Sequence, residues 1–214
     1  RTPVTTIRGY AELYRMGGLP PGDGLDEAMR RTEQEAVRMA RLVDDLLTLA
    51  KLDQGRPLER RPVDLARLLA DAARDAGAVD VGRRLTTELP AGGGAVVVDG
   101  DEDRLRQVIA NVVGNALVHT PPGPPLLLRV VASVARARLA VVDHGPGMPA
   151  DVAARVTQRF YRADPARARH KGGSGLGMSI ADAAVAAHGG AITIDSVEGA
   201  GTTVTVSLPL APGG

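Results

Sequence analysis

The chain has 214 residues, 44% of them hydrophobic, and a formal net charge of +1 at pH 7. A chain of this length forms one or two domains, and no stretch of it is apolar enough to span a membrane. The balanced charge and the 2% aromatic content argue against a nucleic-acid-binding surface, and the absence of cysteine excludes disulfides and thiolate metal sites.

The first part of the chain is predicted to form a helical hairpin. Residues 5–16 carry apolar side chains at helical spacing, and the glycine- and proline-rich stretch 17–24 interrupts this pattern. A longer helix is expected from about Leu25 to Asp53. Its apolar positions form one stripe, made of Met29, Ala36, Met39, Val43, Leu46, Leu47 and Ala50.

This stripe is wider than one neighbouring helix covers, which favours dimerisation of the hairpin into a four-helix bundle. In the alternative interpretation, the hairpin docks on the rest of the chain. Residues 55–62 (GRPLERRP) are polar and bounded by proline, as in a linker. The chain is therefore expected to divide into a hairpin domain, residues 1–55, and a second domain, residues 62–214.

The second domain mixes helix and strand patterns. Helices are predicted at 63–76, with Asp64 as the N-cap, at 101–120 and at 176–188. Strands are predicted at 83–89 and 95–99 flanking the turn PAGGG, at 124–134, at 137–143, and at 191–197 and 202–209 around the turn EGAG. Helices interspersed with strand hairpins indicate an α+β fold, a two-layer sandwich with helices on one face of a mixed sheet.

The stretch GGSGLGMSI (172–180) holds three glycines at alternate positions, Gly173, Gly175 and Gly177, before an apolar helix. Such glycines allow a backbone to approach a phosphate group closely. A Rossmann loop directly follows a strand, whereas the polar stretch YRADPARARHK precedes this loop. A Walker loop ends in Gly-Lys-Ser or Gly-Lys-Thr, which this loop does not. Alone, the loop is equally compatible with a flexible turn.

Two further motifs change this interpretation. The stretch VVDHGPGMP (141–149) places Asp143 at the end of an apolar strand, before Gly145 and Gly147. A carboxylate there can accept a hydrogen bond from an adenine amino group, and the glycines let the base lie against the backbone. Asn111 and Asn115 lie four residues apart on one helix face. An amide oxygen is a hard ligand suited to Mg²⁺, although a buried structural asparagine explains either residue alone.

In chain order the motifs are Asn-x-x-x-Asn, Asp-x-Gly-x-Gly, RFYRAD, Gly-x-Gly-x-Gly and a final Gly-x-Gly-Thr. This series resembles the catalytic domain of bacterial sensor histidine kinases, in the ATPase superfamily shared with gyrase and mismatch-repair ATPases. The hairpin is similar to the dimerisation and phosphoacceptor helices of the same family. RTPVTTIRGYAELY matches the start of the first helix, and RMARLVDDLLTLAKLDQG the end of the second. The resemblance covers essentially the whole chain.

The resemblance implies a site for ATP and Mg²⁺. Asp143 would bind adenine with Gly145 and Gly147, and Asn115 would ligate Mg²⁺ beside Asn111. The other nucleotide-binding positions it implies are His119, then Phe160, Arg162 and Lys171 in a lid, Gly173, Ser174, Gly175, Leu176 and Gly177 in the glycine loop, and Thr202 in the last box. It assigns the catalytic step to Asn111, Arg162 and Thr2.

The resemblance favours a kinase over a hydrolytic ATPase of the same superfamily. Hydrolytic relatives carry a glutamate where Asn111 stands, and an asparagine amide cannot accept a proton from an attacking water. The implied reaction is autophosphorylation of a histidine, followed by transfer to a response-regulator aspartate. Val118 stands where many relatives have a lysine or arginine near the phosphates. It leaves a second interpretation open, an ATP-binding regulatory or scaffold module that dimerises and docks a partner without kinase activity.

The family's phosphoacceptor motif, His-Glu-x-x-Thr-Pro, ends at Thr2 and Pro3, so the acceptor histidine is expected just before Arg1. The four histidines of the chain all lie in the second domain. We expect the cytoplasmic portion of a membrane-anchored receptor, with membrane contact only through upstream segments. The expected partners are a second copy, paired through the hairpin, and a response-regulator receiver domain.

Overall fold

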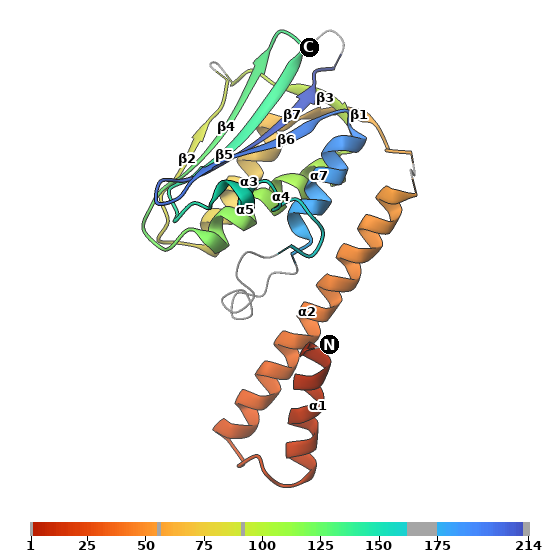
Figure 1. The fold of residues 1–214 in the computed structure, drawn as a ribbon, viewed down its shortest axis with the longest axis vertical. Helices are drawn as coiled ribbons and strands as arrows, with labels where there is room; N and C mark the ends of the chain where they lie inside the picture. The colour runs from red at the N-terminus through yellow and green to blue at the C-terminus, as the bar shows by residue number, and fades with distance from the viewer. Residues whose placement is uncertain (1, 55–56, 91–92, 162–174, 212–214) are drawn as a thin grey trace. The chain divides into compact units, whose positions relative to one another are not determined.

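The computed structural model describes residues 2–54, 57–90, 93–161 and 175–211 (Figure 1). Its internal contacts divide the chain into two units, Arg1–Ala50 and Lys51–Gly214. The first unit holds helix α1 (Thr2–Arg15) and most of helix α2 (Asp23–Asp53). Within the described ranges, no helix is both long and apolar enough to cross a membrane.

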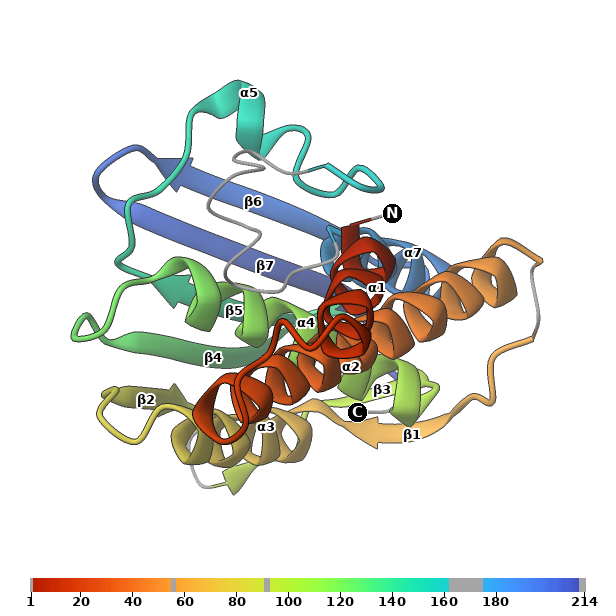
Figure 2. The same ribbon diagram turned by 90° about the horizontal axis from the view of Figure 1, so that it is seen from below.

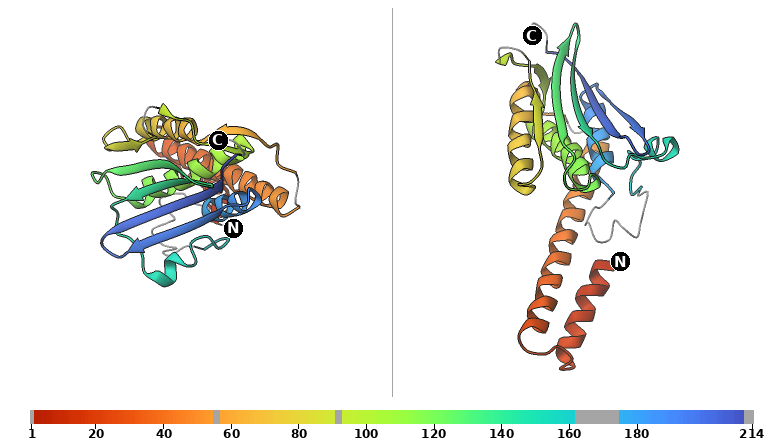
Figure 3. Two further views of the ribbon diagram at one scale, coloured as in Figure 1. Left: turned by 90° about the horizontal axis from the view of Figure 1, so that it is seen from above. Right: turned by 90° about the vertical axis from the view of Figure 1, so that its left-hand side faces the viewer.

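The first unit is the helical hairpin that the sequence predicts. Helix α1 ends where the Gly18 N–H donates to the Leu13 carbonyl (2.9 Å) and Gly17 takes a φ of 68°. A left-handed residue just past the last turn is a common helix stop, and glycine adopts it without steric cost. The two helices then run side by side, and Arg31 donates to the Tyr10 hydroxyl across them (3.3 Å, Figure 3).

The second unit is built on a five-stranded mixed sheet of order β2-β4-β5-β7-β6, with a separate two-stranded sheet β1-β3. Only β2 and β4 pair in parallel among the described strands. The strands are β1 (Arg61–Asp64), β2 (Leu85–Glu88), β3 (Val97–Gly100), β4 (Leu126–Ser133), β5 (Arg136–Asp143), β6 (Ala191–Val197) and β7 (Gly201–Pro209). The helices are α3 (Leu65–Val79), α4 (Glu102–His119), the short α5 (Ala150–Ala153) and α7 (Gly177–Ala187).

Helices α3, α4 and α7 cover one face of the five-stranded sheet (Figure 2). Alternate residues of β4 and β7 point into this layer, and Leu126, Leu128 and Val130 are completely shielded from solvent. A sheet buried on one face shows this period of two because successive side chains point to opposite faces. The predicted two-layer α+β sandwich is confirmed.

Two details of the prediction are wrong. The helix expected from residue 63 begins at Leu65, because Val63 and Asp64 pair with β3 in a short antiparallel sheet. Asp64 is nevertheless the N-cap, since its carboxylate accepts from the Ala66 N–H (2.9 Å). The strands flanking PAGGG do not form a hairpin with each other. One pairs with β4 and the other with β1, in different sheets.

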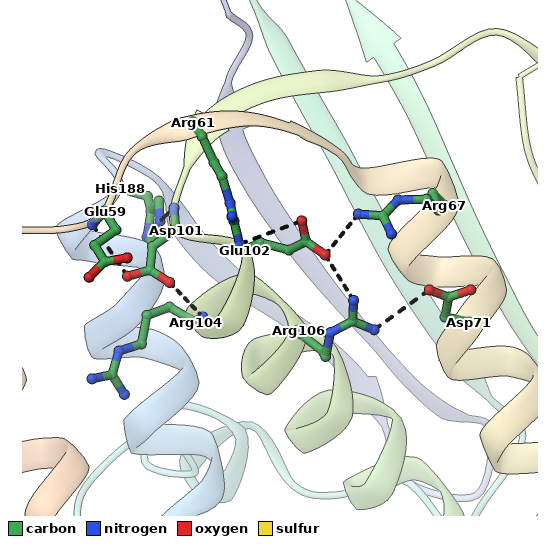
Figure 4. Close-up of polar contacts among 9 residues, drawn as sticks. All are labelled: Glu59, Arg61, Arg67, Asp71, Asp101, Glu102, Arg104, Arg106 and His188. Carbon is green, nitrogen blue, oxygen red and sulfur yellow. Dashed lines mark hydrogen bonds and ion pairs between the residues drawn. The ribbon is translucent and has the colours of Figure 1, made fainter.

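The side chain and the backbone of Asp101 both make hydrogen bonds that fix the start of α4 (Figure 4). Asp101 is its N-cap and accepts from the Arg104 N–H (3.1 Å), while the Asp101 N–H donates to His188 Nε2 (3.0 Å). His188 is the C-cap of α7 and lies with its other ring nitrogen 2.7 Å from the Ala184 carbonyl oxygen. The end of α7 is therefore tied to the beginning of α4.

An ion-pair cluster surrounds Glu102 in the first turn of α4 (Figure 4). Arg67 of α3 donates to its carboxylate (2.8 Å), as does Arg106 (2.9 Å), which also reaches Asp71. The hydrogen bond from Arg67 does most to hold the pKa of the Glu102 carboxyl below its usual 4.5. A negative charge at a helix N-terminus is also favoured by the helix dipole. These contacts join the first turn of α4 to α3.

Candidate nucleotide-binding site

The end of β5 carries the first predicted site residue, Asp143. The strand pairs with β7 so that Asp143 faces Thr202 across the ladder. The Gly145 N–H donates to Asp143 Oδ1 (2.8 Å), which is the only hydrogen bond to this carboxylate among the described residues. The side chain is partly exposed. It therefore retains capacity to accept a hydrogen bond from a ligand.

Two glycines next to Asp143 lie too close to neighbouring backbone for a side chain. Gly147 has a φ of 63°, and a methyl group there would overlap the Val197 carbonyl. Gly201 has a φ of 111°, and a methyl group there would overlap the Asp143 carbonyl. Both conformations are costly for residues with a Cβ. The glycines of the two predicted boxes thus meet at one end of the sheet.

The loop after Asp143 is hydrogen-bonded to the β6–β7 turn. The Gly199 N–H donates to the Pro146 carbonyl (2.7 Å), and the Met148 N–H donates to Ser196 Oγ (3.0 Å). Ser196 Oγ in turn lies 2.8 Å from Thr202 Oγ1. Sequence reasoning identified Thr202 but missed Ser196. Ser196 could have been identified only from the pairing of β6 with β7, which places it opposite Thr202.

Helix α4 presents the second group of predicted residues. Asn111 and Asn115 are both partly buried, and His119, in the last turn, is exposed. Gly177, the first residue of α7, faces Asn111, so that a methyl group on it would lie 3.4 Å from Asn111 Oδ1. The Asn111 Nδ2 atom is shielded from solvent and has no hydrogen-bond partner within the described residues. The amide N–H group therefore retains the capacity to donate a hydrogen bond.

Other predicted residues lie at the edge of the described structure. Leu176 is fully buried at the start of α7, and Gly175 has a φ of 73°. Phe160 is 61% exposed and takes a φ of 60°, unusual for a residue with a side chain. Four predicted residues lie outside the described ranges: Arg162, Lys171, Gly173 and Ser174. Thr2 is the first residue of α1, in the hairpin unit.

The donor set on α4 fits a magnesium ion held mainly by a nucleotide. Mg²⁺ takes oxygen ligands, keeps several waters, and is usually bound through few protein groups together with phosphates. Across the described ranges, no cluster of three His, Cys, Asp or Glu side chains is placed to hold a metal. A single amide oxygen, such as that of Asn115, is consistent with this kind of site.

The fold and the site define a class of protein, a nucleotide-binding α+β sandwich with a preceding helical hairpin. Residues 100–212 match the family described as histidine kinase-, DNA gyrase B-, and HSP90-like ATPase, and residues 1–55 match the His Kinase A (phospho-acceptor) domain. The chain belongs to this ATPase family and carries the phospho-acceptor and ATPase domains of a sensor histidine kinase. The resemblance seen in the sequence is confirmed.

Individual relatives agree with this assignment. The chain is 45% identical over 210 residues to the probable sensor histidine kinase TcrY of Mycobacterium tuberculosis, covering 98% of this chain and 43% of that protein. It is 37% identical to the sensor histidine kinase WalK of Bacillus subtilis, covering 98% of this chain and 34% of that protein. The chain thus spans less than half of these curated relatives.

One solved structure is similar to this chain over nearly its whole length. The structure of full-length ShkA in complex with AMPPNP has a TM-score of 0.75 and 29% sequence identity to this chain. The match covers 99% of this chain and 44% of that one.

Proposed function

We propose that this chain is the ATP-binding and dimerising core of a sensor histidine kinase in a two-component system. The observation that carries the proposal is the convergence of Asp143, Gly147, Gly201 and Thr202 at the shared end of β5 and β7. This convergence occurs in a domain that follows a phospho-acceptor hairpin. The AMPPNP in the ShkA complex supports ATP as the ligand.

The adenine base is assigned to the end of β5. Asp143 accepts a hydrogen bond from the exocyclic amino group, because its carboxylate has only the Gly145 N–H as a partner among the described residues. The glycines beside the strand end let neighbouring backbone segments pack closely around this carboxylate and fix its position. Guanine presents a carbonyl oxygen at the position of this amino group, so the carboxylate would repel it. The site should therefore prefer ATP to GTP.

The phosphates are assigned to the space between α4 and the start of α7. Backbone N–H groups at the N-terminus of a helix attract anions, and Gly177 brings this end of α7 against Asn111. Asn115 would hold Mg²⁺, with Asn111 beside it. When bound, Mg²⁺ neutralises phosphate charge and stabilises the charge that develops in phosphoryl transfer. We also assign phosphate binding to Arg162, Lys171 and the glycines from 173 to 177.

The proposed reaction transfers the γ-phosphoryl group from ATP to an imidazole nitrogen. A bond forms between that nitrogen and the γ-phosphorus, the bond from the γ-phosphorus to the β,γ-bridging oxygen breaks, and ADP leaves. Asn111 cannot remove a proton from water, so hydrolysis is disfavoured against transfer. The acceptor is the histidine of the His-Glu-x-x-Thr-Pro motif that Thr2 and Pro3 end, and a response-regulator aspartate receives the group next.

The hairpin, residues 1–55, is proposed to dimerise, and residues 62–214 to act as the catalytic domain. The stripe that the sequence predicts is largely uncovered, since Met29, Val43, Leu46 and Leu47 are 46–53% exposed. A second copy with the same stripe would cover it by a two-fold interface. The length of the named sensor relatives supports a larger receptor, of which this chain is the cytoplasmic portion.

The decisive experiment is calorimetric titration of Mg·ATP into the wild type and the Asp143→Ala variant. Loss of a charge-assisted hydrogen bond should cost roughly 2–3 kcal/mol, which corresponds to about 30- to 150-fold in Kd. Asp195→Ala, at an exposed aspartate of β6, is the matched control and should bind like the wild type. Unchanged affinity in Asp143→Ala would overturn the adenine assignment.

A further inference from the structure

A buried hydroxyl without a partner lies beside the proposed adenine site. Thr120, the C-cap of α4, is only 2% exposed. Its Oγ1 atom is shielded from solvent and makes no hydrogen bond to any described residue. Buried hydroxyl groups are normally paired, because an unpaired one loses its hydrogen bonds to water without replacement. An unpaired one therefore needs an explanation.

The fold does not need this hydroxyl. The backbone of Thr120 already holds its place, since its N–H donates to the Ala116 carbonyl (2.9 Å) and its carbonyl accepts from Arg83 (3.1 Å). Arg83 is itself fixed by Asp80 (2.7 Å). A valine at position 120 would keep the shape of the side chain and all of these contacts. The hydroxyl is thus a buried polar group that makes no hydrogen bond to the described residues, which is costly.

The hydroxyl shares one small space with the Asp143 carboxylate. A methyl group on Gly145 would lie 2.8 Å from Asp143 Oδ1 and 3.3 Å from Thr120 Oγ1. Both oxygen atoms therefore lie close to the position that a Cβ of residue 145 would occupy. No hydrogen bond joins them in this structure, although Thr120 can donate and the carboxylate can accept. The two groups therefore border the same space at Gly145 from two sides.

We propose that Thr120 is a positioning residue for Asp143, which acts when the nucleotide binds. The Thr120 hydroxyl then donates to the Asp143 carboxylate, beside the existing donor at Gly145. With two donors on the carboxylate, its remaining acceptor positions are directed at the amino group of the base. This inference rests on the proposed function, because it requires Asp143 to contact adenine.

The test compares Thr120→Val with Thr120→Ser, using calorimetric titration of Mg·ATP and Mg·GTP. Thr120→Val should weaken ATP binding by about 5- to 12-fold, as expected for the net loss of one hydrogen bond, and should reduce the preference for ATP over GTP. Thr120→Ser keeps the donor and should stay within two-fold of the wild type. The surface variant Thr193→Val is the matched control for loss of a threonine hydroxyl and should change neither value.

Two further measurements separate positioning from structural support. Without nucleotide, Thr120→Val should unfold at the same urea concentration as the wild type or a higher one, because it removes an unpaired buried hydroxyl. In an Asp143→Ala background, Thr120→Val should cause no further loss of ATP affinity, as a double-mutant cycle requires of coupled residues.

Several outcomes would overturn the inference. These are an ATP affinity of Thr120→Val within two-fold of the wild type, an equal loss in the Asp143→Ala background, an equal loss in Thr120→Ser, or a lowered unfolding midpoint. Failure of the wild type to bind ATP would instead overturn the proposed function itself, so the two failures are distinguishable.

Discussion

The two units of the chain differ in how completely they bury their apolar side chains. In the second unit, Leu126 and Leu128 are completely shielded within a continuous core between helices and sheet. In the hairpin, Leu46 and Leu47 are 46% and 53% exposed. Exposed apolar patches of this kind mark interaction surfaces. The second unit has a core of its own, whereas the hairpin is built to be completed by another surface.

Polar groups on α2 indicate the same incompleteness. Glu35 Oε2 and Arg38 Nε are shielded from solvent, yet neither has a hydrogen-bond partner among the described residues. The two side chains form only a loose ion pair with each other (3.7 Å). Unsatisfied buried polar atoms are costly. These polar groups of the hairpin are thus incompletely paired within the described part of the chain.

The largest expected effect is therefore on dimerisation, from Leu47→Asp. A symmetric interface contains the substitution twice, and each lost leucine contributes about 1.5–3 kcal/mol of burial, so the dimer Kd should rise at least about 100-fold. Analytical ultracentrifugation measures this change.

ATP affinity should stay unchanged in this variant, because the proposed nucleotide site lies in the second unit. Arg41→Asp, at an exposed position off the stripe, is the control. If Leu47→Asp dimerised as strongly as the wild type, the exposed stripe of the hairpin would not be the dimer interface.

In the second unit, the largest expected loss of stability comes from Gly201→Ala. The new methyl group would meet the Asp143 carbonyl at a φ of 111°, which should cost roughly 2–4 kcal/mol in the free energy of unfolding. Gly199→Ala is the matched control, since it also has a positive φ, 79°, but open space around it. It should cost only about 1 kcal/mol. Urea unfolding compares the two. Equal losses would show that backbone strain, rather than contact with the strand, decides the cost.

Asn115→Ala should act on the nucleotide site without unfolding the domain. If the amide oxygen ligates Mg²⁺, the gain in ATP affinity on adding Mg²⁺ should shrink by roughly 5- to 30-fold, the equivalent of about 1–2 kcal/mol. Titrations with Mg²⁺ and with a chelator, in the wild type and the variant, measure this gain. The same Mg²⁺ dependence in both proteins would remove Asn115 from the metal site.

Local motifs indicated individual candidate positions more directly than they indicated which strands pair. Asp143, Gly147 and Gly201 could be proposed from the sequence because each local motif has its own physical reason, a charge at a strand end or a backbone that needs glycine. The partners of β2 and β3 could not, because strand pairing is decided by contacts remote in the sequence. Thr120 was missed for the same reason. Its significance depends on Gly145, 25 positions away, and on an absent hydrogen bond.

The smallest expected effect is a pH dependence of stability from His188. Burial lowers the pKa of its imidazole below 6.5, and the positive charge of Arg60 lowers it further. The hydrogen bond to the Ala184 carbonyl and the negative charges of Asp101 and Asp99 raise this pKa, but burial has the larger effect. The neutral ring accepts the Asp101 N–H at Nε2, which a protonated ring cannot do.

Because the unfolded chain binds the proton more readily, this contribution to stability is complete above about pH 6.5 and declines as the pH falls below it. One proton limits the slope to about 1.4 kcal/mol per pH unit. Urea unfolding at pH 7.5 and 5.5 should show the decline in the wild type and in His144→Gln, whose histidine is exposed, but a smaller one in His188→Gln. The carboxyl of Glu102, with its pKa below 4.5, stays charged throughout this window. An equal decline in all three proteins would mean that protonation of the His188 imidazole does not cause the loss of stability.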